Sequence, residues 1–273
     1  MKSAVAPSQF PVQLSAPDDF FQKRSPNHLS LLSYNIQVGI HTRRYQDYLF
    51  KSWQHVWPCR SRLDNLNKIS DLVRHFDVVA LQEVDGGSFR SGFVNQVEYL
   101  AEHSGQPYWF QQLNRNLGRF AQHSNGVISR FEPHTIDMHT LPGPRGRGAI
   151  ACQLGDEDPL LVVMMHLALG KRTQDQQLRF IRNLIQQYHH VILMGDMNTH
   201  SLRLLYDSPL KDCGLKSAHA RATFPSWQPQ RCLDHILVSQ HLQIVKMGVL
   251  DFPLSDHLPV ALEIELPGDT PLH

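Results

Sequence analysis

The stretch VILMGDMNTH, from Val191 to His200, indicates what kind of fold this chain adopts. Four of its first five residues are apolar, and a short apolar run bounded by turn residues predicts a buried strand. The run ends in Asp196 and Asn198, which are two residues apart. Because an unpaired charge inside a protein costs several kcal/mol, a carboxylate and an amide delivered by a buried strand indicate a polar site at its end.

Other apolar runs also carry polar residues at or near their ends. We expect strands at residues 29–36, 77–84 and 160–167, and later strand-like runs that begin near two Asp-His pairs. Any one of these polar residues alone could be a turn residue, a salt-bridge partner, a strand cap or a core histidine. Together and in this order they favour a shared site where strand ends converge. The residues are Asn35, Gln37, Glu83, His166, Asp196, Asn198, Asp234, His235, Asp256 and His257.

The residue types in this set are those that bind metal ions and phosphates. A carboxylate beside a histidine fixes the tautomer of the ring and stabilises its protonated form. Carboxylate and amide oxygens suit Mg²⁺ or Mn²⁺, and the absence of cysteine from the set argues against zinc. No GxSxG elbow or Walker A loop is present to indicate another route. The set therefore favours metal-assisted attack by water.

Between the strands, apolar residues recur at helical spacing. We expect helices over residues 62–76, 93–102 and 173–188. Mixed helices and strands without an internal repeat predict two packed sheets with helices on their outer faces. One catalytic domain over residues 28–268 suffices, with an N-terminal extension at 1–27 and a tail at 269–273. The remaining expected strands lie at 108–112, 126–129, 148–154, 191–196, 231–239, 242–250 and 257–266.

The composition limits the classes of function. The 273 residues are 41% hydrophobic and 19% charged, as in ordinary globular chains, and the net charge is +1 with a pI of about 7.8. There is no global basic field, which weakens a nucleic-acid function without excluding it. The four cysteines are scattered, so neither a disulfide framework nor a structural zinc site is expected, and a reducing compartment fits. The chain has 17 histidines, and we expect those outside the motifs above to have surface or structural roles.

No signal for export or membrane insertion is visible in the sequence. The first 28 residues lack the continuous apolar core of a signal peptide, and no apolar run approaches the roughly 18 residues of a membrane span. A cytoplasmic location is the resulting default, and we expect a monomer.

The ordered motifs resemble those of the endonuclease/exonuclease/phosphatase superfamily, which includes DNase I, AP endonucleases, sphingomyelinases and inositol phosphatases. GDxN with a later SDH and an upstream QE is a specific combination, and the matches run from about residue 29 to residue 266. The resemblance implies a DNase I-like fold, a four-layer α/β sandwich of two packed, mostly antiparallel sheets flanked by helices. Its site would lie where the loops of the two sheets meet. The matching segments are SYNIQ, LQEVD, NGVISR, MHLALG, GDMNTH, LDHILVS and SDHLPV.

The resemblance also implies a metal site and a catalytic set. Glu83 would be the principal ligand of Mg²⁺, or of Mn²⁺, with Asn35 beside it, while Asp256 would hold the water shell of the metal or a second ion. Asp196 would orient or deprotonate the attacking water. The other members would contact phosphate or orient a histidine: Asn198 and His166 as donors to phosphate oxygens, and His257 at the scissile phosphate, oriented by Asp234.

Four further residues are candidates for substrate binding. Asn125 matches a family position near the phosphate but fits a plain turn equally well. Arg147 and Arg172 could each bind a second phosphate or be solvated, and Gln37 stands where family members have an acid, Gln or His. The loop 41–58, rich in arginine, tyrosine and tryptophan, could stack on nucleobases, pack over the core or meet a lipid interface. We expect substrate choice to be decided in this loop.

The leading hypothesis is a Mg²⁺-dependent hydrolase of phosphodiester or phosphomonoester bonds, which is a nuclease, a phosphodiesterase or a phosphatase. Its substrate would be a nucleic acid (DNA or RNA), a phospholipid or a small phosphoester. One alternative is a catalytically silent binding module on the same fold, against which the complete set of site residues argues. Another alternative is a zinc hydrolase.

Overall fold

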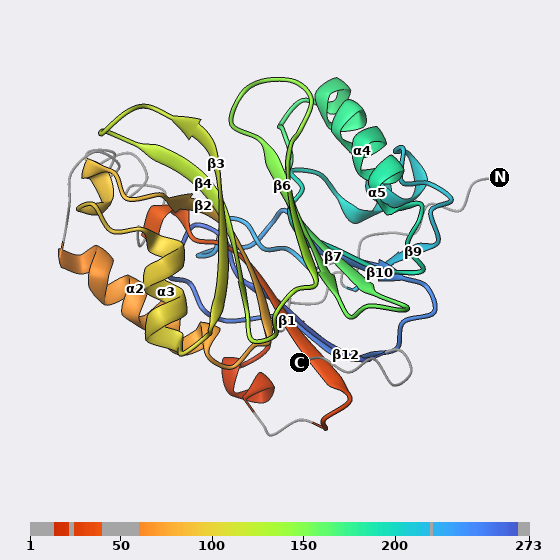
Figure 1. The fold of residues 1–273 in the computed structure, drawn as a ribbon, viewed down its shortest axis with the longest axis horizontal. Coiled ribbons are helices and arrows are strands. Elements are labelled where there is room, and N and C mark those ends of the chain that lie inside the picture. Colours follow the sequence, from red (N-terminus) through yellow and green to blue (C-terminus); the bar gives the residue numbers. More distant parts are fainter. Residues whose placement is uncertain (1–13, 22–24, 40–59, 219–220, 267–273) are drawn as a thin grey trace.

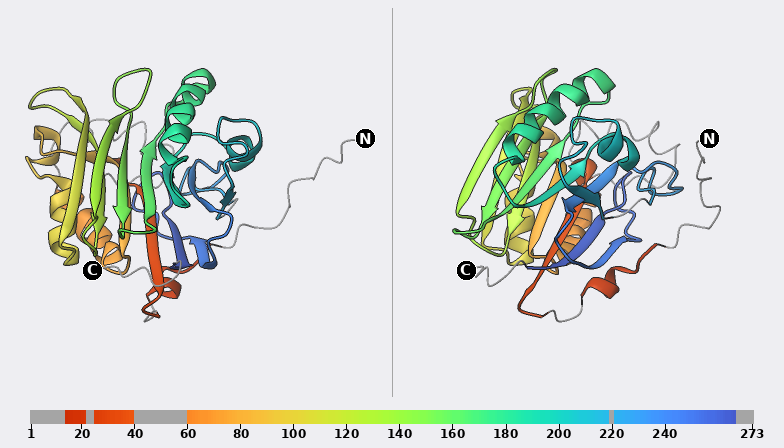
Figure 2. Two further views of the ribbon diagram at one scale, coloured as in Figure 1. Left: turned by 45° about the vertical axis from the view of Figure 1, so that its right-hand side comes forward. Right: turned by 90° about the vertical axis from the view of Figure 1, so that its right-hand side faces the viewer.

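The protein is a four-layer α/β sandwich in which two six-stranded sheets pack face to face between helices (Figure 1). The computed structural model describes residues 14–21, 25–39, 60–218 and 221–266. The two further views in Figure 2 show the same layering, with strands inside and helices outside. The fold predicted from the sequence is therefore confirmed.

The first sheet has the strand order β11-β12-β1-β2-β4-β3. Its neighbours are antiparallel except for the central pair β1 and β2, which run parallel. Parallel neighbours end at the same edge of a sheet, so the carboxyl ends of β1 and β2 lie side by side. The strands are β1 (His28–Asn35), β2 (Val78–Asp85), β3 (Tyr108–Asn116), β4 (Gln122–Ser129), β11 (Ile244–Val249) and β12 (Val260–Glu265).

The second sheet repeats this arrangement with the order β5-β6-β7-β8-β10-β9. Again only the central pair, β7 and β8, is parallel. Both sheets are thus mostly antiparallel, as predicted. The strands are β5 (Thr135–Thr140), β6 (Gly148–Leu154), β7 (Leu160–His166), β8 (His190–Asp196), β9 (Leu215–Ser217) and β10 (Asp234–Ser239).

Three apolar cores hold the layers together, and strand β8 contributes to two of them. Ile192 and Met194 belong to the core between the sheets, whereas Val191 and Leu193 face α4 and α5 on the other side. Successive side chains of a strand point to opposite faces, so a strand covered on both faces is apolar throughout. Burying one Val, Leu or Ile side chain contributes about 1.5–3 kcal/mol, which makes these continuous apolar runs the main stabilising feature of the sandwich.

Four α-helices and three short 3-10 helices complete the described chain. Helices α2 and α3 cover the outer face of the first sheet, and α4 and α5 cover that of the second (Figure 1). In α2 the side chains at Leu66, Ile69, Leu72 and Val73 repeat at helical spacing and are at most 2% exposed. The helices are α2 (Arg60–Val73), α3 (Gln96–Ser104), α4 (Lys171–Ile185) and α5 (Ser201–Tyr206), with η1 (Pro17–Phe20), η2 (Gln37–Gly39) and η4 (Phe89–Ser91).

Helix α3 begins later than the sequence pattern predicts. The Asn95 side chain accepts hydrogen bonds from the backbone N–H groups of Val97 and Glu98, so Asn95 is the N-cap. Phe93, the expected first residue, has a φ of +64° and lies outside the helix. Gly105 ends the helix in the left-handed conformation that glycine adopts without strain.

Part of the segment expected to be an N-terminal extension packs on the domain. The N–H of Ser15 donates to the carbonyl oxygen of Val249 at 2.9 Å, and Phe20 is 2% exposed within the core under α2 and α3. Domain boundaries at residues 28 and 268 stay a prediction. Within the described residues, no helix combines the length and the apolar character that crossing a membrane requires.

Candidate active site

The polar residues predicted from the sequence meet where strand ends of the two sheets come together. The Asn35 side chain, at the end of β1, donates from Nδ2 to Oδ2 of Asp196, at the end of β8, over 3.2 Å. Both residues are at most 2% exposed. This contact joins one sheet to the other at the site, as the expected convergence of strand ends requires.

Within the second sheet, strand register places three site residues in one row. His166 of β7 and Asp234 of β10 are both register partners of Asp196 in β8. The Nε2 atom of His166 lies 3.6 Å from Asp196 Oδ2, and the Nε2 atom of His257 lies 3.9 Å from the same oxygen. Asp196 is thus the centre of the constellation.

The backbone before and after Asp196 explains the Gly-Asp-Met-Asn sequence. Gly195 has a φ of +141°, and a Cβ at this position would lie 1.9 Å from the carbonyl oxygen of Met165 in the neighbouring strand, so only glycine fits. Asn198 also has a positive φ, +51°, and its N–H donates to Asp196 Oδ1 at 3.0 Å. Its Nδ2 donates to the carbonyl oxygen of Leu167 at 3.0 Å. The turn therefore holds Asn198 and Asp196 against each other.

Burial and nearby carboxylates raise the pKa of Asp196 to about 7. Burial is the largest cause, and the charges of Asp234 and Glu83 act in the same direction. His257 opposes the shift because its positive charge favours the carboxylate. A carboxylate with this pKa can accept a proton from water near neutral pH.

His257 is held in a buried chain of hydrogen bonds. Its Nδ1 lies 2.8 Å from Oδ2 of Asp234, and Thr223 Oγ1 donates to the same carboxylate oxygen at 2.5 Å. Burial lowers the pKa of His257, but the charge of Asp234 and the hydrogen bond to it, with Asp196 and Asp256, raise it well above its usual range. These neighbours favour the protonated form of the ring, whose Nε2 lies 3.9 Å from Oδ2 of Asp196.

Arg147 is part of this constellation. It comes from the turn between β5 and β6 and donates from Nη1 to Nε2 of His166. Burial, followed by the charges of Arg147 and His257, holds the pKa of His166 well below its usual value, so this ring is neutral and accepts the hydrogen bond. The Arg147 guanidinium therefore contacts the strand-end cluster through His166, and phosphate binding by Arg147 stays a prediction.

Glu83 lies in an irregularity of β2 that turns its side chain out of the regular alternation. The register between β2 and β4 breaks between Leu81 and Val84, and Glu83 has a φ of +55°. Bulges re-aim side chains, and left-handed backbone outside glycine is concentrated at functional sites. The Glu83 charge raises the pKa values of Asp196 and Asp256, so its carboxylate lies near the same cluster.

Asp256 is the fourth acid in the cluster. It is 8% exposed, and burial raises its pKa to about 6, with a further contribution from Glu83. The Ser255 hydroxyl donates to its Oδ1 at 3.2 Å, and its backbone carbonyl accepts from the N–H of Ser226 at 2.8 Å. Its neighbour His257 thereby enters the site at a fixed position.

The donor set fits a hard divalent cation. Four carboxylates (Glu83, Asp196, Asp234 and Asp256) lie close enough for their charges to interact, and a positive ion would relieve their mutual repulsion. Oxygen ligands are those that Mg²⁺ and Mn²⁺ prefer. Asp196, Asp234 and His257 also offer ligand atoms that all lie within 4.8 Å of one another.

The remaining substrate-binding candidates differ in where they lie. Asn125 is 1% exposed and donates from Nδ2 to the carbonyl oxygen of Gly148 at 3.4 Å, next to Arg147. Gln37 follows β1, and its N–H donates to Asn35 Oδ1 at 3.2 Å. Arg172 instead lies on α4 and lines a surface hollow that contains none of the strand-end residues. The loop 41–58, in which substrate choice was expected to be decided, lies outside the described residues.

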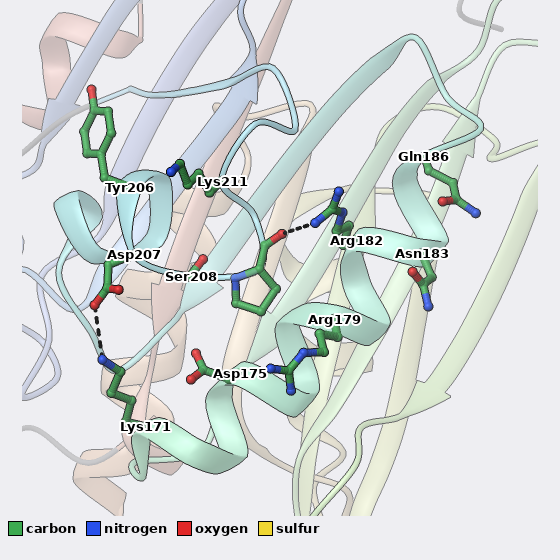
Figure 3. Close-up of a pocket in the computed structure, with 11 residues that line it drawn as sticks. Lys171, Asp175, Arg179, Arg182, Asn183, Gln186, Tyr206, Asp207, Ser208 and Lys211 are labelled. Atoms are coloured by element: carbon green, nitrogen blue, oxygen red, sulfur yellow. Dashed lines mark hydrogen bonds and ion pairs between the residues drawn. The ribbon is translucent and has the colours of Figure 1, made fainter.

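A second hollow, of about 830 Å³, lies between α4 and α5 (Figure 3). Lys171 pairs with Asp207 at 3.1 Å, and Arg182 donates to the carbonyl oxygen of Pro209 at 3.4 Å. Arg179 also lines the hollow. It contains none of the strand-end residues.

Supporting residues were not found by sequence reasoning. Thr223, which holds Asp234, lies in an irregular segment and has no motif around it. Gln174 of α4 is 2% exposed and donates to the carbonyl oxygens of Ala168 and Asn198 at 2.7 and 3.1 Å. Gln174 and Gln177 are both buried on the inner face of α4. Polar residues that interrupt an apolar helix face are the sequence feature that could have identified Gln174 as a supporting residue.

The chain belongs to the endonuclease/exonuclease/phosphatase family, whose model matches residues 32–257. Members of this family are phosphoester hydrolases. No curated protein matches the sequence significantly.

Solved structures share the fold at low sequence identity. An endonuclease/exonuclease/phosphatase family protein from Bacteroides thetaiotaomicron is 16% identical with a TM-score of 0.67, covering 90% of this chain and 100% of that one. A mannosyl-6-phosphatase from the same species is 17% identical with a TM-score of 0.63, covering 86% and 99%. D. rerio TDP2 complexed with a single-strand DNA product is 17% identical with a TM-score of 0.62, covering 87% and 98%. At these identities the likeness shows the fold alone.

Proposed function

We propose that this protein is a Mg²⁺-dependent hydrolase that cleaves a P–O bond of a phosphodiester or phosphomonoester by attack of water. The observation that carries the proposal is the position of Asp196, which contacts Asn35 of the other sheet and lies within 4 Å of two histidines of opposite character. The surroundings favour the protonated form of His257 and the neutral form of His166, so the site would hold a base, a cationic donor and a neutral ring together.

The residues divide the chemistry between them. Asp196, with a pKa of about 7, orients the attacking water and accepts its proton. His257, held by Asp234, donates from Nε2 to a phosphate oxygen, where negative charge increases in the transition state. Arg147 and Asn198 supply further N–H donors to the phosphate. General acid–base help of this kind contributes about 10²–10⁴-fold in rate.

Glu83 and Asn35 would hold the metal, with Asp256 at its water shell or at a second ion. When bound, Mg²⁺ would neutralise part of the phosphate charge and so lower the repulsion between the phosphate and the attacking water. The buried carboxylates around this position are consistent with that role, since they carry raised pKa values that a cation would lower.

Two substrate classes remain in the proposal. A net charge of +1 favours neither a nucleic acid nor a phospholipid or small phosphoester. The structural neighbours include a sugar-phosphate phosphatase and a protein complexed with single-strand DNA, so the fold accommodates both classes. The salt dependence of the activity distinguishes the two substrate classes. Binding of a nucleic acid releases counterions and weakens steeply as the salt concentration rises, whereas binding of a small phosphoester weakens less.

The test is hydrolysis of a substrate panel by purified protein with Mg²⁺, Mn²⁺, Zn²⁺ or EDTA. The panel contains plasmid DNA, an abasic duplex, single-stranded DNA, RNA, sphingomyelin, phosphoinositides, a hexose 6-phosphate and bis-p-nitrophenyl phosphate. His257→Ala removes the cationic donor, and His134→Ala is the matched control at an exposed histidine.

Turnover that needs Mg²⁺, persists in His134→Ala and is lost in His257→Ala supports the proposal, and the preferred panel member identifies the substrate class. Turnover restored by zinc alone favours a zinc hydrolase. No turnover of any panel member by folded protein favours a binding module on the same fold.

A further inference from the structure

Three histidines lie together at the end of the second sheet opposite to the active site. His189 and His190 stand at the start of β8, and His241 follows β10. Because β8 and β10 are antiparallel, with Ile192 opposite Val238, the end of β10 lies beside the start of β8. Strand β8 has seven residues, so this cluster is roughly 20 Å from Asp196 at about 3.3 Å per residue.

The contacts of His190 fix the direction of both its ring nitrogens. Nε2 lies 2.8 Å from Oδ2 of Asp158, and Nδ1 lies 2.8 Å from Nε2 of His241. The rings of His189 and His241 are stacked, with centroids 4.2 Å apart and 14° between their planes. One nitrogen from each of the three rings lies within 4.8 Å of the others.

These contacts determine where the protons are. The Asp158 carboxylate accepts the proton that Nε2 of His190 carries, so Nδ1 of the same ring has a free lone pair. That lone pair accepts a hydrogen bond from the N–H at Nε2 of His241. A metal ion could replace this one proton and bind both nitrogens, because a carboxylate on the far nitrogen is the usual way to orient a metal-binding histidine.

The surroundings of His241 favour the neutral form of its ring, which binds metals. Burial, followed by the charges of His189, His190 and Lys216, lowers the pKa of His241. Neutral imidazoles are the ligands that Zn²⁺, Ni²⁺ and Cu²⁺ prefer, whereas Mg²⁺ prefers oxygen.

We propose that His189, His190 and His241 form a binding site for a transition-metal ion of the Zn²⁺ class, with Asp158 as the residue that orients His190. The distance between the nitrogens of His190 and His241 would open from 2.8 Å to about 3.3 Å, the edge of a tetrahedron with metal–nitrogen bonds of about 2.0 Å. Small rotations of exposed rings achieve this.

The fourth position of such a site is open to solvent. His189 and His241 are exposed, and both line a cavity of about 420 Å³ together with Cys213. Three histidines with a water complete a four-coordinate zinc site without cysteine. The ion would link the turn before β7, the start of β8 and the turn after β10, which stabilises this end of the second sheet. The proposal does not depend on the function proposed for the strand-end site.

The test is a titration of the metal-free full-length protein with Co²⁺, whose visible absorption reports imidazole coordination, in the presence of excess Mg²⁺. The variants are His189→Ala/His241→Ala, Asp158→Asn, His257→Ala at the strand-end site, and His134→Ala as a matched exposed histidine. Two of the three ligands are exposed, and thermal unfolding in EDTA verifies that each variant folds.

We expect the wild type to bind one equivalent of Co²⁺, and His134→Ala and His257→Ala to bind it with the same affinity. In His189→Ala/His241→Ala the affinity for Co²⁺ should fall at least tenfold. Asp158→Asn should weaken it about tenfold, at the lower end of the usual 10–100-fold effect of an orienting carboxylate because Asp158 is largely exposed. Zn²⁺ should displace Co²⁺ and raise the melting temperature of the wild type but not of the double variant. Co²⁺ binding that is equal in the double variant and the wild type, or that is lost only in His257→Ala, would overturn the proposal.

Discussion

The hydrogen bond between Asp234 and His257 allows a quantitative prediction. Asp234→Asn keeps the size of the side chain but removes the charge that raises the pKa of His257. The bond is 2.8 Å long and Asp234 is 1% exposed, so it is a buried, charge-assisted bond of the kind that contributes about 1.5–3 kcal/mol. If this energy acts on the protonated ring in the transition state, kcat falls about 10- to 150-fold, at 1.36 kcal/mol for each factor of ten.

The assay is steady-state hydrolysis of bis-p-nitrophenyl phosphate, or of the preferred panel substrate, at saturating Mg²⁺. We expect the loss in kcat with little change in KM, because Asp234 acts through His257 and does not touch the substrate. Thr223→Val, which keeps the carboxylate and removes only its hydroxyl donor, should lose less. Asp137→Asn, an exposed carboxylate on β5, is the matched control. A folded Asp234→Asn protein with kcat within about twofold of the wild type would refute the reasoning.

Three further outcomes follow from the structure. Gly195→Ala should lower the free energy of unfolding by about 2–5 kcal/mol, through the steric clash and the left-handed backbone, and an unchanged midpoint in urea would contradict this. Arg147→Ala should lower kcat/KM at least tenfold while Arg172→Ala stays within about twofold, so equal effects would remove Arg147 from the site. Burial raises the pKa of Asp85, but hydrogen bonds and a buried arginine outweigh it and hold the pKa below its usual value. The stability from this group is present above the unfolded pKa of about 4 and is lost as pH falls through the folded pKa; Asp85→Asn should flatten the acid limb of stability, measured by urea unfolding between about pH 5 and 3.

Most of the strands and helices that the sequence predicted are buried on one or both faces. Their apolar residues therefore form continuous runs, as in β8, or repeat at helical spacing, as in α2. Strand β5 is largely exposed and so lacks an apolar face, whereas β9 has three residues and α5 has six, which are too few for a period to be detected. The late start of α3 depends on Asn95, whose capping role the apolar pattern does not contain.

The site was predicted as a set of residues but not as a geometry. Asp196 and its neighbours were visible because polar residues interrupt apolar strands. The contact between Asn35 and Asp196 depends on how one sheet packs on the other, and no local pattern specifies that packing. Arg147 was left undecided because only the fold brings its turn to His166.

The histidine cluster shows the same limit in another part of the molecule. All three histidines were expected to have surface or structural roles, and the sequence places His241 about fifty residues from His189 and His190. Strand pairing between β8 and β10 brings the three rings together. Their common position is a property of topology and not of local sequence.

The central claim is that Asp196 is the group that activates water at the strand-end site. The direct test is the Mg²⁺-dependent rate of Asp196→Asn near neutral pH, compared with Asp137→Asn and with wild-type protein. The account predicts that Asp196→Asn loses about 10²–10⁴-fold in kcat while Mg²⁺ binding and folding persist. A folded, Mg²⁺-bound Asp196→Asn protein that turns over within a few-fold of the wild type would contradict it.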